Sequence, residues 1–119
     1  MILTNTKRLT FGRYSEYDLE YLFELNGDSD VMKYITLGRP MTIEEVKNKS
    51  IPRIMKAYTH GPDFGIFPAF LINDNQYIGS FQFEPDYEIK NVIEIGWRLK
   101  KSFGQKINHI LVYLMYYMN

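Results

Sequence analysis

Hydrophobic and polar side chains alternate along residues 92–99. One set of alternate positions is apolar, and the other combines a valine with a carboxylate, a glycine and a guanidinium. The apolar set is Ile93, Ile95, Trp97 and Leu99, and the other set is Val92, Glu94, Gly96 and Arg98. This period of two predicts a β-strand with one apolar face. The glycine inside the strand is typical of a bulge, or of a close approach by another backbone or a ligand.

A short basic segment with one glycine follows this strand, at residues 100–106. A strand that leads into a glycine-containing turn and then a helix can hold an anion on its backbone N–H groups. Lysines and a single glycine also describe many ordinary surface loops. The pattern by itself therefore leaves both interpretations open.

Two helices are predicted ahead of this region. Ser15 and Asp18 match the helix-start signature of a hydroxyl followed three residues later by a carboxylate, which predicts a helix over residues 15–26. The same signature at residues 42–45 begins a second helix that ends at residue 60. Pro52 should kink or divide the second helix, because proline removes a helical hydrogen bond. One further helical turn is predicted by Val31, Met32, Tyr34 and Ile35.

Three more strands are predicted, at residues 3–14, 64–72 and 77–83. Pro68 should place its strand at a sheet edge or beside a bulge, because proline cannot donate to a ladder. Short turns between consecutive strands favour an antiparallel meander. The predicted order is β-α-α-β-β-β, an α+β fold in which helices pack on a mostly antiparallel sheet. In the strand at 77–83, one face is predicted to hold Tyr77, Gly79, Phe81 and Phe83.

The apolar segment at residues 107–118 has helical spacing and predicts a short C-terminal helix. A strand is the alternative, because valine and tyrosine favour strands. If other parts of the chain do not cover this segment, it forms a dimer surface or an aggregation hazard.

Composition narrows the function classes. The chain has 119 residues, so one domain over residues 1–119 is expected. Its formal net charge is zero, which gives no support for nucleic-acid binding. It has no cysteine, and its two histidines lack metal-motif spacing, so no metal site is predicted. The longest apolar run falls far short of the ~20 residues that span a membrane, and a cytoplasmic protein that binds no membrane is expected.

Six short segments, taken in order, resemble the GNAT superfamily of N-acetyltransferases, in particular the branch that includes the ribosomal-protein-alanine acetyltransferases. Each segment is loose, but their common order over residues 2 to about 105 is specific. They are residues 6–11, 17–26, 30–35, 42–45, 77–80 and 94–99.

The resemblance implies acetyl transfer from acetyl-CoA, as co-substrate, to an amine. It implies that backbone near Trp97, Arg98 and Leu99 pairs with the pantetheine arm like an added strand. It also implies that the loop at Gly104, Gln105 and Lys106 holds the pyrophosphate on N–H groups.

The same resemblance makes Glu94 the candidate for taking the amine's proton, directly or through water. The alternative for Glu94 is a solvated carboxylate or an ion-pair partner of Arg98 on the same strand face. Arg98 is a candidate for contact with the cofactor's phosphates, and an ordinary ion pair is the alternative that we favour for it. Ser80 and Gln82 are candidate acceptor contacts, and the loop that contains Tyr34 would border the acceptor pocket.

The segment after Gln105 departs from the family. Lys106 stands where the family has a second phosphate-loop glycine, and its side chain would crowd the pyrophosphate. Residues 106–119 form an atypical apolar tail in place of the family's further helices and strands, which suggests C-terminal truncation, for example by a frameshift. A shortened sheet would expose the strand at 92–99 and favour a homodimer or higher self-association.

Two function classes remain open at this point. One is an acetyl-CoA-dependent N-acetyltransferase whose acceptor is a protein N-terminus or a small-molecule amine such as an aminoglycoside or a polyamine. The other is a catalytically inactive, truncated remnant that acts as a self-associating or interaction module.

Overall fold

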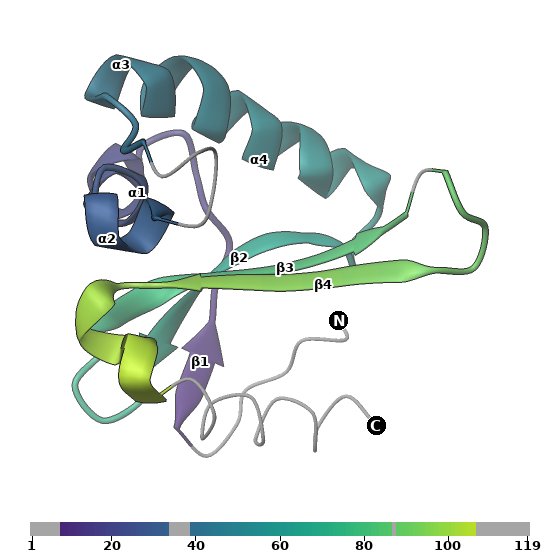
Figure 1. Ribbon diagram of the computed structural model, residues 1–119. Coiled ribbons are helices and arrows are strands. Elements are labelled where there is room, and N and C mark those ends of the chain that lie inside the picture. The colour runs from purple at the N-terminus through teal and green to yellow at the C-terminus, as the bar shows by residue number, and fades with distance from the viewer. Residues whose placement is uncertain (1–7, 34–38, 87, 107–119) are drawn as a thin grey trace.

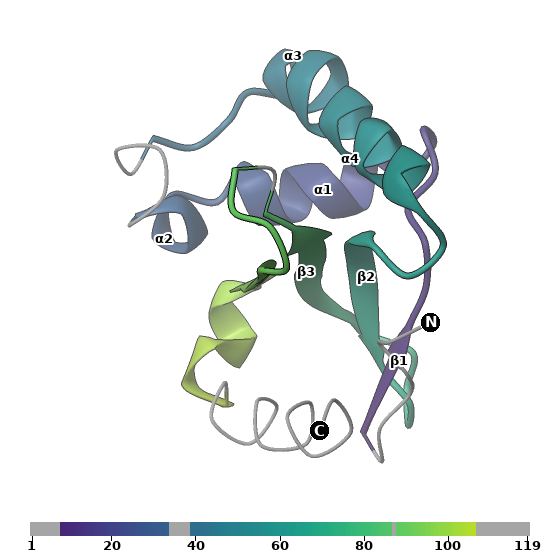
Figure 2. The ribbon, with the colours of Figure 1, turned by 90° about the vertical axis from the view of Figure 1, so that its right-hand side faces the viewer.

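A computed structural model describes residues 8–33, 39–86 and 88–106. Four antiparallel strands form one sheet in the order β1-β2-β3-β4. The strands are β1 (Leu9–Phe11), β2 (Gly65–Leu71), β3 (Tyr77–Pro85) and β4 (Ile93–Leu99). The helical segments α1 to α4 lie on one side of this sheet (Figures 1 and 2). The predicted α+β class and the antiparallel meander are therefore confirmed. The predicted C-terminal helix lies outside the described residues.

The first helical layer consists of α1 (Leu19–Asn26) and the short α2 (Ser29–Met32). The predicted helix began at Ser15, four residues too early. Instead, the Ser15 backbone N–H and hydroxyl both donate to Asp18 Oδ2, at 2.7 and 3.2 Å, and form a turn before the helix. The residues of the helix-start signature therefore form a local turn just before α1, and the N-cap residue Asp18 makes no side-chain capping bond to the helix.

The second helical layer runs from α3 (Ile43–Glu45) through the π-helical segment η2 (Val46–Ser50) into α4 (Ile51–Ala57), and the 3₁₀ turn η3 (Tyr58–His60) closes it. Thr42 and Glu45 form the predicted capping box. The prediction that Pro52 divides this helix is confirmed in a specific form. The Ile51 N–H bonds the Val46 carbonyl in a wider turn immediately before the proline. This π turn sits where an ordinary helix would meet the missing N–H and the ring of proline.

Two buried clusters pack against opposite faces of the sheet. The cluster between sheet and helices contains Tyr14, Leu22, Leu25, Val46, Ile51, Ile54 and Tyr77. The cluster on the other face contains Leu9, Phe67, Ala69, Ile78, Phe81, Phe83, Leu99 and Phe103. Burial of a large apolar side chain contributes about 1.5–3 kcal/mol, so these clusters hold the sheet and the helices together.

A register shift between Ala69 and Phe70 corrects the predicted faces of β3. Tyr77 packs on the helix side, whereas Ile78 packs with Phe81 on the opposite face. The prediction assumed unbroken alternation, but the irregularity reverses the faces at the start of the strand. Pro68 lies next to this shift and beyond the last β1–β2 pair, Phe11 with Ala69, so the predicted bulge accompanies the proline.

Candidate functional site

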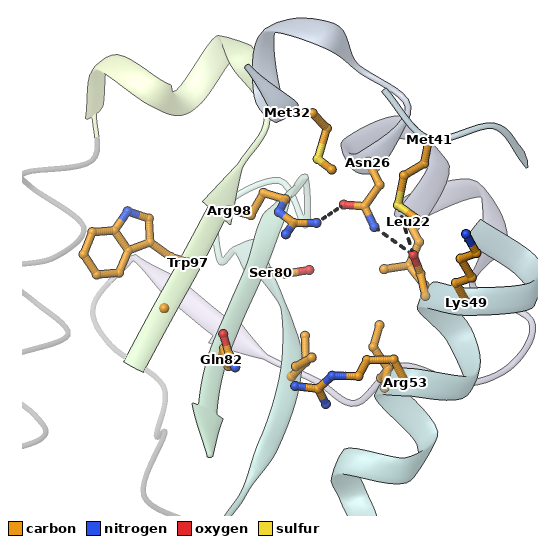
Figure 3. A pocket seen from close by; sticks show the side chains of 14 residues that line it. Leu22, Asn26, Met32, Met41, Lys49, Arg53, Ser80, Gln82, Trp97 and Arg98 are labelled. Carbon is orange, nitrogen blue, oxygen red and sulfur yellow. Dashed lines mark hydrogen bonds between the residues drawn. The ribbon is translucent and has the colours of Figure 1, made fainter. Parts of the chain in front are cut away.

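A cavity of about 580 Å³ opens between the helices and the middle of β3 and β4 (Figure 3). Its wall combines apolar side chains from the helices with polar and basic side chains from both layers. The polar and basic lining residues are Asn26, Lys49, Ser50, Arg53, Ser80, Gln82 and Arg98. A concave site that combines apolar walls with a few polar groups is the usual form of a small-molecule site.

The alternation predicted for β4 determines what this strand presents to the cavity. Gly96 and Arg98 line the cavity, whereas the Trp97 ring points away from it (Figure 3). The register places Arg98 opposite Ser80 and Gly96 opposite Gln82, so the predicted candidates Ser80 and Gln82 lie beside them. The structure therefore brings four of the predicted site residues to one cavity: Ser80, Gln82 and Arg98, and also Trp97, which lines the cavity although its ring points away.

Asn26, at the end of α1, connects the first helical layer to β4 and to the second helical layer. The Arg98 guanidinium donates to Asn26 Oδ1 at 2.6 Å, and the Asn26 amide donates to Ser50 Oγ at 3.3 Å. The Asn26 carbonyl also accepts the Met41 N–H at 2.8 Å. Sequence reasoning treated Asn26 as a helix stop. Its position at the end of α1 is consistent with that role, but no local pattern shows that its side chain reaches across to β4.

Arg98 carries its charge in a partly buried setting. Burial lowers the pKa of its guanidinium, because desolvation disfavours the charged form. The expected ion-pair partner, Glu94, is four residues away, about 13 Å along an extended strand. Arg98 bonds the neutral Asn26 amide instead, and the ion-pair expectation for Arg98 is wrong.

A second arginine is neutralised within the wall. Arg53 meets Glu84 in a two-pronged pair, at 3.0 and 2.9 Å, and Glu84 is almost fully buried. The predicted strand ended at Phe83, whereas β3 continues through Glu84 to Pro85. Glu84 shares the polar face of β3 with Ser80 and Gln82, and this spacing of two is the signal that could have identified it.

Three hydroxyl groups form a buried hydrogen-bond network behind the part of the cavity wall that contains Ser80. Tyr14 Oη lies 2.5 Å from Ser80 Oγ and 2.6 Å from Tyr77 Oη. Burial raises the pKa of Tyr14 and raises that of Tyr77 to about 12, so both phenols are neutral at physiological pH. Ser80 is thereby fixed to a neutral hydrogen-bond network at the cavity wall.

The outer edge of β4 presents backbone groups. The Lys100 N–H bonds the Ile78 carbonyl at 2.8 Å. Bonded pairs alternate along an antiparallel ladder, so Arg98 also bonds towards β3. Trp97 and Leu99 therefore direct their N–H and C=O groups to the other edge. Within the described sheet β4 is the last strand, so these groups face away from the sheet.

The basic segment after β4 coils into the 3₁₀ turn η4 (Lys101–Lys106), which contains Gly104, Gln105 and Lys106. Lys100 forms an ion pair with Glu24 of α1, and Lys101 pairs with Asp30 of α2 at 2.8 Å. The pair lowers the pKa of Asp30 and raises that of Lys101. Two lysines of the predicted anion-binding turn are thus matched with carboxylates.

Two further predicted residues, Glu94 and Leu99, do not line the cavity. Glu94 is exposed and is not among the residues that line it. Tyr34 lies outside the described residues. Leu99 is buried in the cluster on the opposite sheet face. Within residues 8–33, 39–86 and 88–106, no group of three His, Asp or Glu side chains is placed to hold a metal ion. No helix in that part of the chain is long and apolar enough to cross a membrane.

Comparisons with known proteins agree with this architecture. The family described as "Acetyltransferase (GNAT) domain" matches residues 8–115. A crystal structure of an acetyltransferase of the GNAT family from Bacillus anthracis is similar, with a TM-score of 0.67 and 30% sequence identity. The match covers 86% of this chain but 55% of that protein, so the chain spans about half of its length. No curated protein matches the chain.

Proposed function

This chain belongs to the GNAT acetyltransferase family, and we propose that it transfers an acetyl group from acetyl-CoA to an amine bound in the cavity. The amine nitrogen forms a bond to the thioester carbonyl carbon, the C–S bond breaks, and CoA leaves as the thiolate, which takes up a proton to give the thiol. The amine's proton goes to a base. Beyond family membership, we assign a binding position on this chain to each of the two reactants.

One observation carries the proposal: β4 presents backbone groups along its outer edge and side chains to the cavity from one face. Trp97 and Leu99 direct backbone groups to the outer edge, where an amide-containing pantetheine arm can pair as an added strand. Arg98 and Gly96 face the cavity from the same strand. Both reactants would then meet along one short segment, which supplies the proximity that group transfer needs.

The β4 edge fits the pantetheine arm of acetyl-CoA better than the following turn, η4, fits the pyrophosphate. Backbone amides at the edge match the hydrogen-bonding groups of pantetheine. Lys100 and Lys101 are already paired with Glu24 and Asp30, so their charge is partly compensated before a phosphate arrives. We propose that the N–H groups of η4, around Gly104, Gln105 and Lys106, meet the pyrophosphate.

We propose Glu94 as the proton acceptor, directly or through water. It shares the strand face of Gly96 and Arg98, and its exposed position suits relay of a proton to solvent. Ser80 and Gln82 are proposed to contact the acceptor. The acceptor amine is a protein N-terminus or a small-molecule amine, and the six ordered segments support the ribosomal-protein-alanine branch.

The test offers acetyl-CoA and a panel of peptides and small amines to the purified chain. The rate of acetyl transfer is measured from the release of the CoA thiol. Glu94→Gln should lower kcat about a hundredfold, the size of a typical general-base contribution. Glu88→Gln, an exposed carboxylate in the β3–β4 connection, is the matched control and should leave kcat unchanged. Equal rates for wild type and Glu94→Gln would remove Glu94 from this role.

The second candidate is a non-catalytic GNAT-like module that acts through self-association or interaction with a partner. Two features favour this second candidate because each weakens a phosphate site. Lys100 and Lys101 are already paired with carboxylates, and Lys106 stands in place of a glycine. Failure of the chain to bind acetyl-CoA would select this candidate.

A further inference from the structure

The basic side chains in the cavity wall differ in how their charge is compensated. Lys49 lies 3.8 Å from Glu45, and Arg53 is held by both oxygens of Glu84. Arg98 meets only a neutral partner among its hydrogen bonds in the described chain, the amide oxygen of Asn26. Arg98 is therefore the cation of the wall whose charge no carboxylate offsets in residues 8–33, 39–86 and 88–106.

The geometry of Arg98 suits a ligand rather than a purely structural role. A guanidinium has five N–H donors, and the bond to Asn26 engages one of its terminal nitrogens. Figure 3 shows the group at the cavity wall between Asn26 and Ser80. Burial lowers its pKa, which means that the surroundings disfavour its charge. An anion in the cavity would offset that cost.

The rest of the lining agrees with an anionic ligand. Among the residues that the structure describes, the lining contains Lys49, Arg53 and Arg98 and no Asp or Glu. A polycationic amine such as a polyamine or an aminoglycoside would therefore meet charges of its own sign. The Ser80 hydroxyl and the Gln82 amide add neutral hydrogen-bonding groups next to Arg98 on the neighbouring strand.

We propose that the acceptor is an amine that also carries an anionic group, a carboxylate or a phosphate, and that Arg98 binds this anion. The inference rests on the proposed acetyl transfer for the identity of the ligand as an acceptor. It narrows the acceptor class, because it sets polyamines and aminoglycosides aside. Asn26 is a positioning residue, since it holds the guanidinium against the cavity and is itself held by Ser50.

The test is an NMR titration of the full chain with three probes, followed at the Ser80 and Arg98 backbone amides. The probes are β-alanine, O-phosphoethanolamine and spermidine, each with and without desulfo-CoA. The anion-bearing probes should bind at least about tenfold more tightly than spermidine, the size expected for a charge-assisted contact. The two anionic probes distinguish a carboxylate from a phosphate.

Two variants separate the charge of Arg98 from its packing. Asn26→Asp places a carboxylate where the amide oxygen now accepts the Arg98 bond, so it keeps the contact but cancels the charge. Arg98→Met keeps much of the side-chain volume and removes the charge. Both variants should lose the tenfold preference. Lys47→Met, an exposed lysine outside the cavity lining, is the control and should keep it.

Spermidine binding as tightly as the anionic probes, or no shift at Arg98 with either anionic probe, would overturn the inference. Competition between desulfo-CoA and the anionic probes would also overturn it, because the guanidinium would then serve the cofactor. The titrations without desulfo-CoA remain informative if the chain does not bind the cofactor. Failure of the proposed function and failure of this inference are therefore distinguishable.

Discussion

At the residue scale, the cavity wall depends on polar side chains that are held by other side chains. Asn26 is 5% exposed and joins Arg98 to Ser50. Glu84 is 1% exposed and is matched by Arg53. Groups this deeply buried destabilise a fold when their partner is removed, because they lose their hydrogen bonds without regaining water.

The Arg53–Glu84 pair should contribute measurably to stability. Arg53→Met leaves the Glu84 carboxylate buried without its guanidinium, and we expect the free energy of unfolding to fall by about 1–3 kcal/mol. The loss should be smaller than for a fully buried pair, because the Arg53 side chain is 48% exposed. Urea denaturation measures it.

The double variant Arg53→Met with Glu84→Met is the control for this pair. It removes both charges and should recover most of the loss, since buried ion pairs are replaced by apolar groups at little cost. If Arg53→Met alone is as stable as wild type, solvent rather than Arg53 satisfies Glu84.

Alkaline pH should weaken the fold through the phenols beneath the cavity. Burial raises the pKa of Tyr77 from 10.0 to about 12. Between pH 10 and 12 the unfolded chain loses this proton while the folded chain keeps it, so the free energy of unfolding falls as pH rises. Tyr77 alone should account for about 3 kcal/mol, which is present below pH 10 and absent above pH 12.

Denaturation at a series of pH values measures this effect, and Tyr77→Phe is the matched variant because it removes the titrating group. The variant should lose less stability than wild type between pH 10 and 12. Equal pH dependence in both proteins would show that Tyr77 does not carry the effect.

The positions of single site residues were predictable only where the alternation of side chains along one strand assigns them to a face. Gly96 and Arg98 lie on the face that alternation assigns to them, and Ser80 and Gln82 lie beside them. The roles of Asn26 and Glu84 were not predictable. Each contact joins elements far apart in sequence, and no local pattern encodes which distant side chain meets an amide or a carboxylate.

At the scale of elements, the position of β4 depends on close contact with β3. Gly79 has φ +152°, and a Cβ built there would collide with the Arg98 carbonyl oxygen. The backbones can approach this closely only because position 79 lacks a side chain. The same contact between the two backbones fixes where Arg98 lies relative to the cavity.

Gly79→Ala should therefore displace β4 and lower the free energy of unfolding by about 1–3 kcal/mol or more, through steric strain and an unfavourable φ. Thermal denaturation measures this loss. Gly96→Ala is the control, because its Cβ would meet only the flexible end of the Gln82 side chain, at 3.0 Å. Comparable losses at both positions would contradict this explanation.

Element types were predictable, but their bounds and faces were less so. The capping box at Thr42 identified the second helix, because a cap is a local interaction. The bulge beside Pro68 was anticipated only as one of two options, and its effect on the faces of Tyr77 and Ile78 was missed. Periodicity cannot show where one extra residue enters a ladder.

At the scale of the whole molecule, the helices cover one face of a sheet whose last strand within the described residues is β4 (Figures 1 and 2). The order of elements was predictable, because strand and helix patterns follow one another along the chain with short turns. The six ordered segments pointed to the family that the comparisons support.

Self-association through β4 is a prediction at this scale. Ile93, Ile95 and Trp97 are 45%, 47% and 39% exposed beside the outer edge. We expect two copies to pair along this edge and to separate in Ile95→Lys. Saturating acetyl-CoA should also separate them, since it is proposed to use the same edge. Sedimentation velocity checks this prediction, and a wild-type monomer at high concentration would contradict it.

Binding of acetyl-CoA to the purified 119-residue chain tests the central claim most directly. Calorimetry with acetyl-CoA, and with desulfo-CoA as comparison, should give a micromolar dissociation constant if the β4 edge and the η4 turn accept the pantetheine arm and the pyrophosphate. Absence of binding at millimolar cofactor would contradict acetyl transfer by this chain and favour the non-catalytic module.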